Sequence, residues 1–112
     1  MVTQGSDNNG AVSICEIIDP TTTNLGVPTA NMSATRGKGG LVTLPNGTVM
    51  AFGNTSDPGT EIFTESTELW TTGSPMVVNR FGNIGYGWLS SGKLIVIGGD
   101  GAGTCELFDP SV

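Results

Sequence analysis

Three aspartates lie in glycine-rich segments, and the oxygen atoms of their side chains are of the kind that binds calcium. Asp7, Asp57 and Asp100 each have glycine nearby, and asparagine accompanies the first two. Carboxylate and amide oxygens are calcium ligands. None of the three segments has the spacing D-x-[DN]-x-[DN]-G of a calcium loop, whereas Asp and Asn also favour turns by bonding to their own backbone. The turn is the favoured interpretation, so we predict no metal and no other cofactor.

Histidine is absent from the 112 residues. Its absence removes hydrolysis by a Ser-His-Asp triad and most transition-metal sites. No other arrangement of nucleophile and base stands out in the sequence. We therefore predict that the chain has no catalytic residues and is not an enzyme.

The charge balance excludes two classes of partner. Ten acidic and four basic residues give a net charge of −6. Nucleic acids and anionic membrane surfaces are bound by clusters of Lys and Arg, which this sequence lacks. No window approaches 18 consecutive apolar residues, so no membrane-spanning helix is predicted, and the first ten residues do not form a signal peptide.

A polar, lysine-poor composition favours an extracellular or cell-surface protein. Three N-x-S/T sequons are present and are candidate glycosylation sites. Asn46 and Asn54 are expected in accessible loops and should be modified before the third, Asn31.

An internal repeat of about 45 residues organises the chain. The segment 15–20 (CEIIDP) reappears at 105–110 (CELFDP), and a third copy (EIF, 61–63) lies midway between them. A second element, 44–53, matches 89–98 at the same spacing. Several elements that share one period near 45 fit a propeller blade or a paired-helix repeat. Short β-branched runs separated by Gly, Pro and Asn exclude the helical option.

Each repeat unit is predicted to form four strands. The Asn46-Gly47 and Ser91-Gly92 pairs should make the hairpin turns between the first two, because Gly and Asn tolerate positive φ. The second strand is apolar nearly throughout, as expected where both faces are covered. The first strand is predicted at 40–44 and 84–89, and the second at 48–52 and 93–97. The third is predicted at 13–18, 60–63 and 104–108, and the fourth at 23–26 and 68–72.

These residues resemble the kelch family of β-propellers, of the galactose-oxidase-like type. The apolar strand that ends in Gly-Gly at 94–99 and the E-L-F-D-P strand at 106–110 match the kelch blade. Trp70, Met76 and Arg80 occupy the other typical positions. The resemblance implies an all-β, kelch-like propeller of about two and a half four-stranded blades in an incomplete ring. Its parts would be a partial blade (1–35), a full blade (36–79) and a partial blade (80–112).

The resemblance also marks two arginines. Arg36 and Arg80 precede the first strand of a blade, near the central channel, where many kelch relatives bind partners. Both are therefore candidates for contact with a protein or carbohydrate ligand. The alternative is structural, because kelch blades often join this arginine to the glutamate of the third strand. Three such glutamates recur at equivalent positions: Glu16, Glu61 and Glu106.

The cysteines and aromatic residues each have two interpretations. Cys15 and Cys105 occupy equivalent positions two blades apart, so their Cα atoms should be farther apart than the roughly 7 Å that a disulfide between them would allow. We favour two buried thiols, and the alternative is a disulfide to a residue elsewhere. Trp70, Trp88 and Tyr86 could stack on sugar rings, although Trp70 is at the kelch position that usually packs between blades.

The predicted function is that of a non-catalytic extracellular propeller segment for binding, adhesion or structural assembly. Its partners would be further blades, from the parent chain or from identical copies, since a ring of fewer than about four blades does not close. One alternative is a fragment of a copper radical oxidase. In relatives of that kind, the copper centre uses two His, two Tyr and a Cys. The segment that corresponds to the region of this Cys, residues 36–40, has no Cys, and Tyr86 is the sole tyrosine of the chain. Another alternative is a lectin assembled from several chains.

Overall fold

The fold is built from antiparallel β-strands. The computed structural model describes residues 2–3, 6–22, 26–54 and 56–111. Within these ranges the regular elements are β1 to β12, and no helix is present. The all-β prediction is therefore confirmed. No helix in this part of the chain is long and apolar enough to cross a membrane.

The first sheet has the strand order β1-β4-β5. Its strands are β1 (Val2–Thr3), β4 (Cys15–Ile17) and β5 (Val27–Pro28). A small ribbon, which the sequence did not predict, joins β2 (Ser6–Asp7) to β3 (Gly10–Ala11). The predicted fourth strand at 23–26 falls mostly on residues 23–25, which lie outside the described residues, and β5 begins just after it.

The second sheet is a four-stranded meander in the order β6-β7-β8-β9. It contains β6 (Gly40–Thr43), β7 (Val49–Phe52), β8 (Glu61–Thr64) and β9 (Leu69–Thr72). Gly47 has a φ of 87° in the turn between β6 and β7, where its N–H donates to the Leu44 carbonyl. The predicted hairpin at Asn46-Gly47 is thus confirmed.

The third sheet repeats the first three strands of the second. Its strands are β10 (Gly85–Trp88), β11 (Leu94–Ile97) and β12 (Cys105–Phe108). Gly92 has a φ of 83° and makes the same turn as Gly47. In the second sheet Val49 pairs with Phe63, and 45 residues later Leu94 pairs with Phe108. The sequence repeat is therefore a repeat of strand register.

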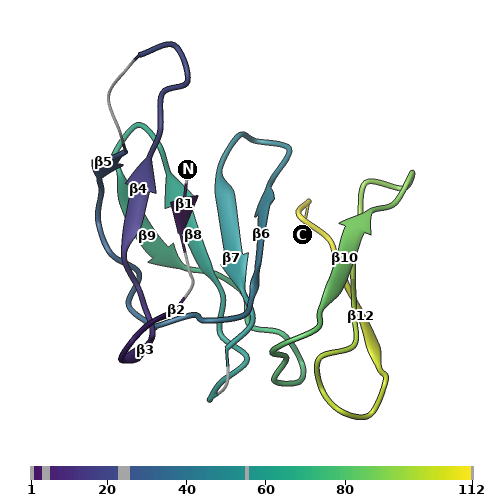
Figure 1. The fold of residues 1–112 in the computed structure, drawn as a ribbon. Helices are drawn as coiled ribbons and strands as arrows, with labels where there is room; N and C mark the ends of the chain where they lie inside the picture. The colour runs from purple at the N-terminus through teal and green to yellow at the C-terminus, as the bar shows by residue number, and fades with distance from the viewer. Residues whose placement is uncertain (1, 4–5, 23–25, 55, 112) are drawn as a thin grey trace.

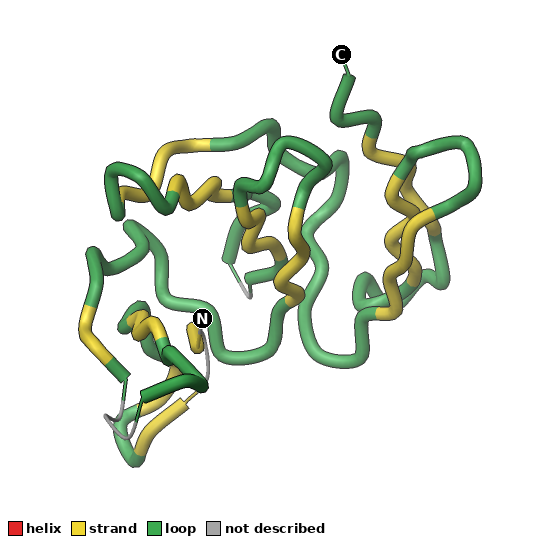
Figure 2. Tube along the Cα trace, turned by 90° about the horizontal axis from the view of Figure 1, so that it is seen from above, coloured by secondary structure: helices red, strands yellow, loops and turns green. Residues whose placement is uncertain are grey.

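The three sheets lie side by side in chain order (Figures 1 and 2). Apolar side chains fill the two spaces between them. Between the second and third sheets, the buried core residues are Leu44, Met50, Phe52, Leu94 and Val96. Between the first and second, they are Cys15, Met32 and Ala51, with Leu41 and Trp70 packed against them. Each sheet is thus held to its neighbour by side chains from both.

None of the described residues covers the far face of the third sheet. Its side chains, Ile95, Ile97, Cys105 and Leu107, alternate with those that face the second sheet, and we call them the open face. Ile97 is 45% exposed and Leu107 60% exposed. Their equivalents 45 residues earlier are Phe52, which is 1% exposed, and Ile62, which packs against the core. The difference arises because the third sheet covers the second, whereas no described segment covers the third.

Candidate functional site

Arg36 lies in the connection to β6 and is fully buried, with 1% of its surface exposed. Its Nη1 donates to the carbonyl oxygens of Gly53 at 3.2 Å and Gly59 at 3.1 Å. Its Nη2 donates to Glu61 Oε2 at 3.2 Å, which is also an ion pair. The arginine therefore joins the end of β7 to the start of β8. Its Nε has no hydrogen-bond partner among the described residues.

Arg80 builds the same cluster in the third sheet. Its exposed fraction is 0%, and its Nη1 donates to the carbonyls of Gly98 at 2.7 Å and Thr104 at 2.9 Å. Its Nε donates to Glu106 Oε2 at 2.6 Å, and its Nη2 to the Thr104 hydroxyl at 2.9 Å. Gly53 and Gly98, like Gly59 and Thr104, are 45 residues apart. The two arginines thus bind equivalent carbonyls and equivalent glutamates.

The structural alternative for the arginines, an ion pair with the repeated glutamate, is confirmed for Glu61 and Glu106. Contact between either arginine and a ligand stays a prediction. It would require a buried guanidinium to leave carbonyl and carboxylate partners that now satisfy it. A buried charge that loses its partner is costly, so this geometry favours a structural role.

The glutamates also bind the backbone of the connection that leads into the first strand of their own sheet. Glu61 Oε1 accepts from the N–H and the hydroxyl of Ser33, at 2.7 and 2.9 Å. Glu106 Oε1 accepts from the N–H of Val77, which is the residue equivalent to Ser33. Burial raises the pKa of Glu61, but the hydrogen bonds from Ser33, Arg36 and Ala34 outweigh it and hold the pKa below 4.5. Sequence reasoning missed these backbone contacts, although Ser33 and Val77 each follow the repeated methionine directly.

The aspartate side chains in the glycine-rich loops accept hydrogen bonds from the backbone of their own loops. Asp57 accepts from the N–H of Gly59 at 2.7 Å. The Asp100 carboxylate accepts from the Thr104 hydroxyl and from the N–H groups of Ala102, Gly103 and Thr104. These bonds, that of the Thr104 hydroxyl above all, lower the pKa of Asp100 from 3.8 to about 2 against the opposing effect of desolvation. The turn interpretation is confirmed for both, while the side chain of Asp7 lies outside the described residues. In the part described, no group of three His, Cys, Asp or Glu is placed to hold a metal ion.

The cysteines differ from each other, so the expectation of two buried thiols is wrong for one of them. Cys15 is buried between the first and second sheets, and its Sγ donates to the Ser13 carbonyl. Cys105 is a free thiol on the open face and is exposed. The equivalent position in the second sheet, Thr60, is 3% exposed and is bonded to residues 73 and 74: its carbonyl accepts from the Gly73 N–H and its hydroxyl donates to the Ser74 carbonyl. No described segment contacts Cys105 in this way.

The aromatic residues also differ from one another in packing and exposure. Trp70 packs on Phe63 with ring centroids 5.2 Å apart, and its Nε1 donates to the Ala30 carbonyl at 3.1 Å. This confirms the expectation that Trp70 packs between sheets. Tyr86 meets Phe52 edge to face at 5.0 Å and is 44% exposed. Trp88 is 40% exposed, and stacking of either residue on a sugar stays a prediction.

The sequons have unequal surroundings. Asn46 and Asn31 are exposed, whereas Asn54 is 7% exposed and its Nδ2 donates to Asp57 Oδ2. The expectation that Asn54 is accessible is therefore wrong: its loop folds inward, and its N–H donates to the Arg80 carbonyl at 3.0 Å. Modification of any of the three stays a prediction.

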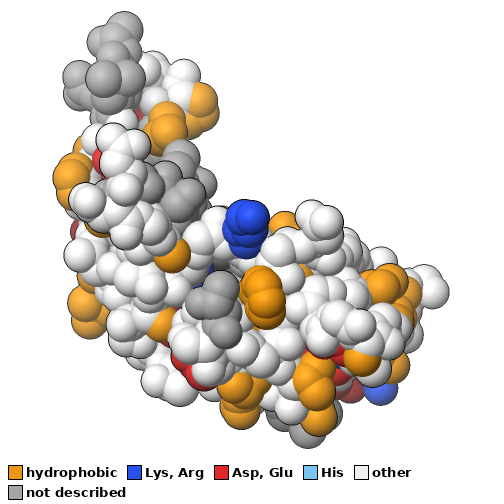
Figure 3. All heavy atoms as spheres, turned by 60° about the horizontal axis from the view of Figure 1, so that its bottom comes forward, with side chains coloured by type: hydrophobic (Ala, Val, Ile, Leu, Met, Phe, Trp, Pro, Cys, Tyr) orange, Lys and Arg blue, Asp and Glu red, His pale blue; other side chains and the backbone are white. Residues whose placement is uncertain are grey.

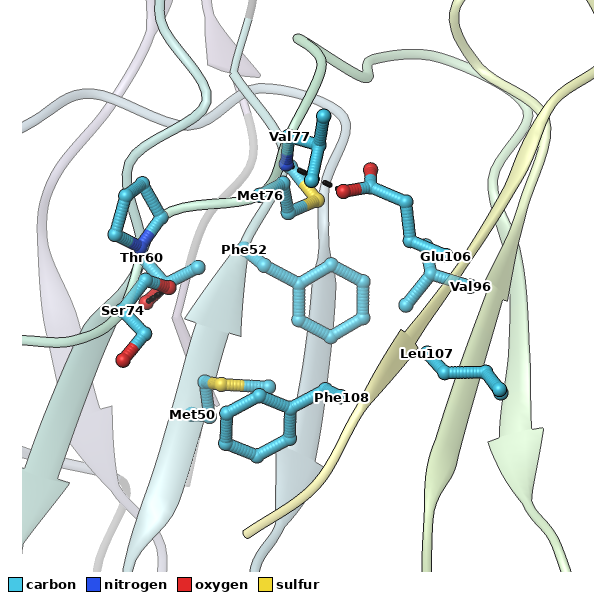
Figure 4. A pocket seen from close by; sticks show the side chains of 11 residues that line it. Met50, Phe52, Thr60, Ser74, Met76, Val77, Val96, Glu106, Leu107 and Phe108 are labelled. Atoms are coloured by element: carbon cyan, nitrogen blue, oxygen red, sulfur yellow. Dashed lines mark hydrogen bonds between the residues drawn. The ribbon is translucent and has the colours of Figure 1, made fainter. Parts of the chain in front are cut away.

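A pocket with a volume of about 100 Å³ opens between the second and third sheets (Figure 4). Phe108 projects from β12 toward Met50, and Val96 and Met76 line the same space. The Val77 N–H and Glu106 lie at its rim. The lining is largely apolar, and its polar atoms are mostly engaged already. The pocket therefore suits an apolar group better than a reacting substrate.

The sequence matches no family model and no curated protein among those compared. The assignment of a function therefore depends on the residues and geometry described above.

Proposed function

We propose that this chain is a stretch of a kelch-like β-propeller that acts outside the cell as a non-catalytic unit for binding, adhesion or structural assembly. One observation carries the proposal: two arginines of equivalent position are buried and bound to equivalent carbonyls and glutamates. A ligand-binding arginine needs free N–H groups at a surface. Both guanidinium groups here are buried, and each is bound to two backbone carbonyls and to a glutamate.

The clusters explain how irregular connections hold a fixed shape. Arg80 joins the residue after β11, the residue before β12 and a side chain of β12 itself. Charged hydrogen bonds of this kind are shorter and about twice as strong as neutral ones. They fix the two ends of the long loop between β11 and β12.

The open face supports an assembled rather than an isolated unit. It presents Ile97, Leu107 and Cys105 to solvent, where the second sheet presents buried or core-packed residues. Hydrophobic side chains also reach the surface at several separate places in Figure 3. Contiguous apolar patches on soluble proteins commonly mark interaction sites. We infer that a further blade, from a longer parent chain or an identical copy, covers the open face.

The two cysteines provide a direct test of this inference. Cys105 lies on the open face, whereas Cys15 is buried inside the chain and serves as an internal control. A maleimide pulse should label Cys105 quickly at low protein concentration. At high concentration, the labelling of Cys105 should slow at least tenfold while that of Cys15 stays slow throughout. Labelling of Cys105 that is equally fast at every concentration would count against assembly through this face.

A further inference from the structure

We propose that Asn46 is a site of slow self-modification. Its side-chain amide is lost when the backbone nitrogen of Gly47 attacks the side-chain carbonyl, and Thr48 activates that carbonyl for the attack. Glycine suits the attacking position because it has no Cβ to crowd the nitrogen or restrict the backbone. The inference does not depend on the proposed function, since the reaction needs only the turn between β6 and β7 and water.

The Asn46 side chain is folded back along the backbone that follows it. Its Oδ1 accepts from the N–H of Thr48 at 3.0 Å and from the Thr48 hydroxyl at 2.7 Å. In this arrangement, an Asx-turn, the side-chain carbonyl takes the place of a backbone carbonyl. Gly47 lies between the two bonded residues, so the carbonyl is held along the peptide unit that has to attack it and not out in solvent.

The surroundings of Gly47 leave room for the reaction. Its φ is 87°, and a Cβ built on it would meet no described atom within 4 Å. Asn46 is exposed, so ammonia can leave and water can enter. One contact opposes the attack, because the Gly47 N–H donates to the Leu44 carbonyl at 2.9 Å. This bond at the hairpin tip has to open first, which makes the reaction slow.

The chemistry takes two steps and involves no oxidation or reduction. First, the Gly47 nitrogen gives up its proton and bonds to Cγ of Asn46, while the bond from Cγ to Nδ2 breaks. Nδ2 takes up one proton from solvent and leaves as ammonia, and a five-membered succinimide remains. Second, water cleaves one of the two bonds from the ring nitrogen to a carbonyl carbon. Cleavage at Cγ gives aspartate, and cleavage at the backbone carbonyl gives isoaspartate.

Thr48 supplies what the first step needs. As the nitrogen adds to Cγ, Oδ1 changes from a neutral carbonyl oxygen into an oxyanion, and the two donors of Thr48 are already bonded to it. Hydrogen bonds to a charged acceptor are about twice as strong as neutral ones. They therefore stabilise the addition more than the starting amide, which is the condition for acceleration. The oxyanion hole of an enzyme acts in the same way.

Two similar dipeptides in the chain lack this arrangement. The Asn-Gly pair at 9–10 is followed by Ala11, which has no hydroxyl. The Asp-Gly pair at 100–101 begins with a carboxylate that accepts from three backbone N–H groups and from a threonine hydroxyl. These bonds keep the carboxylate ionised, and an ionised carboxylate resists attack by an amide nitrogen. We therefore expect Asn46 to react first.

The product differs from asparagine in charge and, as isoaspartate, in the length of the main chain. Each event adds one negative charge to a chain whose net charge is −6. Isoaspartate adds one carbon to the main chain inside the turn, which the Leu44 N–H closes by donating to the Thr48 carbonyl at 2.8 Å. An N-linked glycan would use the same Nδ2 that leaves as ammonia. Glycosylation and loss of the amide at Asn46 therefore exclude each other.

The equivalent turn of the third sheet offers a matched control. Gly92 has a φ of 83°, and its N–H donates to the Leu89 carbonyl at 2.9 Å, as that of Gly47 does to Leu44. Here Ser91 replaces the asparagine and Lys93 replaces the threonine. The variant Ser91→Asn thus creates the same dipeptide in the same turn without the hydroxyl, and the further change Lys93→Thr completes the motif.

The experiment uses the 112-residue chain, made in a host that attaches no glycans and incubated at physiological pH and temperature. Peptide mapping by mass spectrometry, with fragmentation that separates aspartate from isoaspartate, follows each asparagine over time. We expect first-order loss of the Asn46 amide that becomes faster as the pH rises. Thr48→Val should slow it by about fivefold, well below the loss of about 10²–10³ seen in enclosed enzyme sites, because this turn is exposed to water.

Two further variants separate the hydroxyl from the fold. Thr48→Ser keeps a hydroxyl and should restore the parent rate. The asparagine introduced by Ser91→Asn should react about fivefold more slowly than Asn46, and the added Lys93→Thr should remove the difference. Circular dichroism and the midpoint of thermal unfolding are measured on each variant. We expect both to match the parent, because Val and Ser at the start of β7 leave its backbone bonds in place.

Two results would overturn the proposal. One is an Asn46 amide that stays intact in the folded chain over a period in which the free peptide of residues 42–50 (VTLPNGTVM) is fully converted. The other is a Thr48→Val chain that loses the amide as fast as the parent and the Thr48→Ser chain do. Neither result bears on the open face, which the labelling of Cys105 tests separately.

Discussion

Arg80 Nε and Glu106 Oε2 lie 2.6 Å apart inside the third sheet, and the arginine has no exposed surface. The same pair is present in the second sheet as Arg36 and Glu61, at 3.2 Å through Nη2. In both sheets the guanidinium also binds two backbone carbonyls. A charged pair with these backbone hydrogen bonds has a structural role, and its removal should lower the free energy of unfolding.

Replacement of Arg80 by Leu should destabilise the fold by about 3–5 kcal/mol, because it leaves the largely buried Glu106 carboxylate without its cation. Urea unfolding followed by circular dichroism measures the change. The double variant Arg80→Leu with Glu106→Leu should recover only part of the loss: neither charge of this pair then remains, but Asp100, whose Oδ2 lies 3.8 Å from Arg80 Nη1, still lacks its cation. As the matched control, Lys38→Leu at an exposed position should stay within about 0.5 kcal/mol. A similar, small effect of Arg80→Leu would contradict a structural role.

The stability of the chain should fall in acid in part through Asp100. Its folded-state pKa of about 2 lies below the ordinary 3.8, so its carboxylate favours the folded state above about pH 4. This contribution is lost as the pH falls from about 4 to about 2. The Asp100→Asn variant should therefore show a flatter dependence of unfolding free energy on pH in this window. Titration of the carboxyl carbon by NMR gives the pKa directly, and a midpoint near 4 would refute the account.

A methyl group should be tolerated at Gly85 and not at Gly40, although the two are equivalent. A Cβ on Gly40 would lie 2.2 Å from Cζ of Phe52, a ring that is buried against Tyr86. On Gly85 the nearest atom outside its chain neighbours is Cβ of Ile97, at 3.9 Å. Gly40→Ala should cost about 1–3 kcal/mol, as overpacked cores do, and Gly85→Ala less than about 0.5. Equal costs in thermal unfolding would show that the packing at Phe52 is not as described.

Glycan attachment should follow exposure. In a eukaryotic secretory host, Asn46 should be occupied and Asn54 should remain bare, because Asn54 is 7% exposed and its side chain is bonded within its own loop. Peptide mapping by mass spectrometry gives the occupancy of each site. The Asn46→Gln variant should lose one glycan mass, and a glycan found on Asn54 would disprove the ordering.

The repeat made much of the fold predictable from the sequence. The glutamates 16, 61 and 106 and the turn glycines 47 and 92 hold one period, so strands and turns could be placed within a few residues of those observed. Gly47 and Gly92 are informative because a positive φ in a tight hairpin has few other solutions. The ribbon of β2 and β3 could not be found in this way, because the described residues of the other two repeats form no counterpart of it.

Burial was harder to predict, because it depends on what lies next to a sheet. Cys15 and Cys105 have equivalent sequence surroundings, yet one is buried and the other exposed. Asn54 has a typical loop sequence, but its loop folds against the Arg80 carbonyl, a contact over 26 positions.

The most direct test of the account is the molar mass of the 112-residue chain by sedimentation equilibrium over a hundredfold range of concentration. We predict reversible association that Leu107→Glu on the open face removes and that Leu69→Glu, at a position of similar exposure on β9, leaves intact. A single monomeric mass at every concentration, with a cooperative thermal transition that does not depend on concentration, would contradict the claim that these sheets are built to be covered.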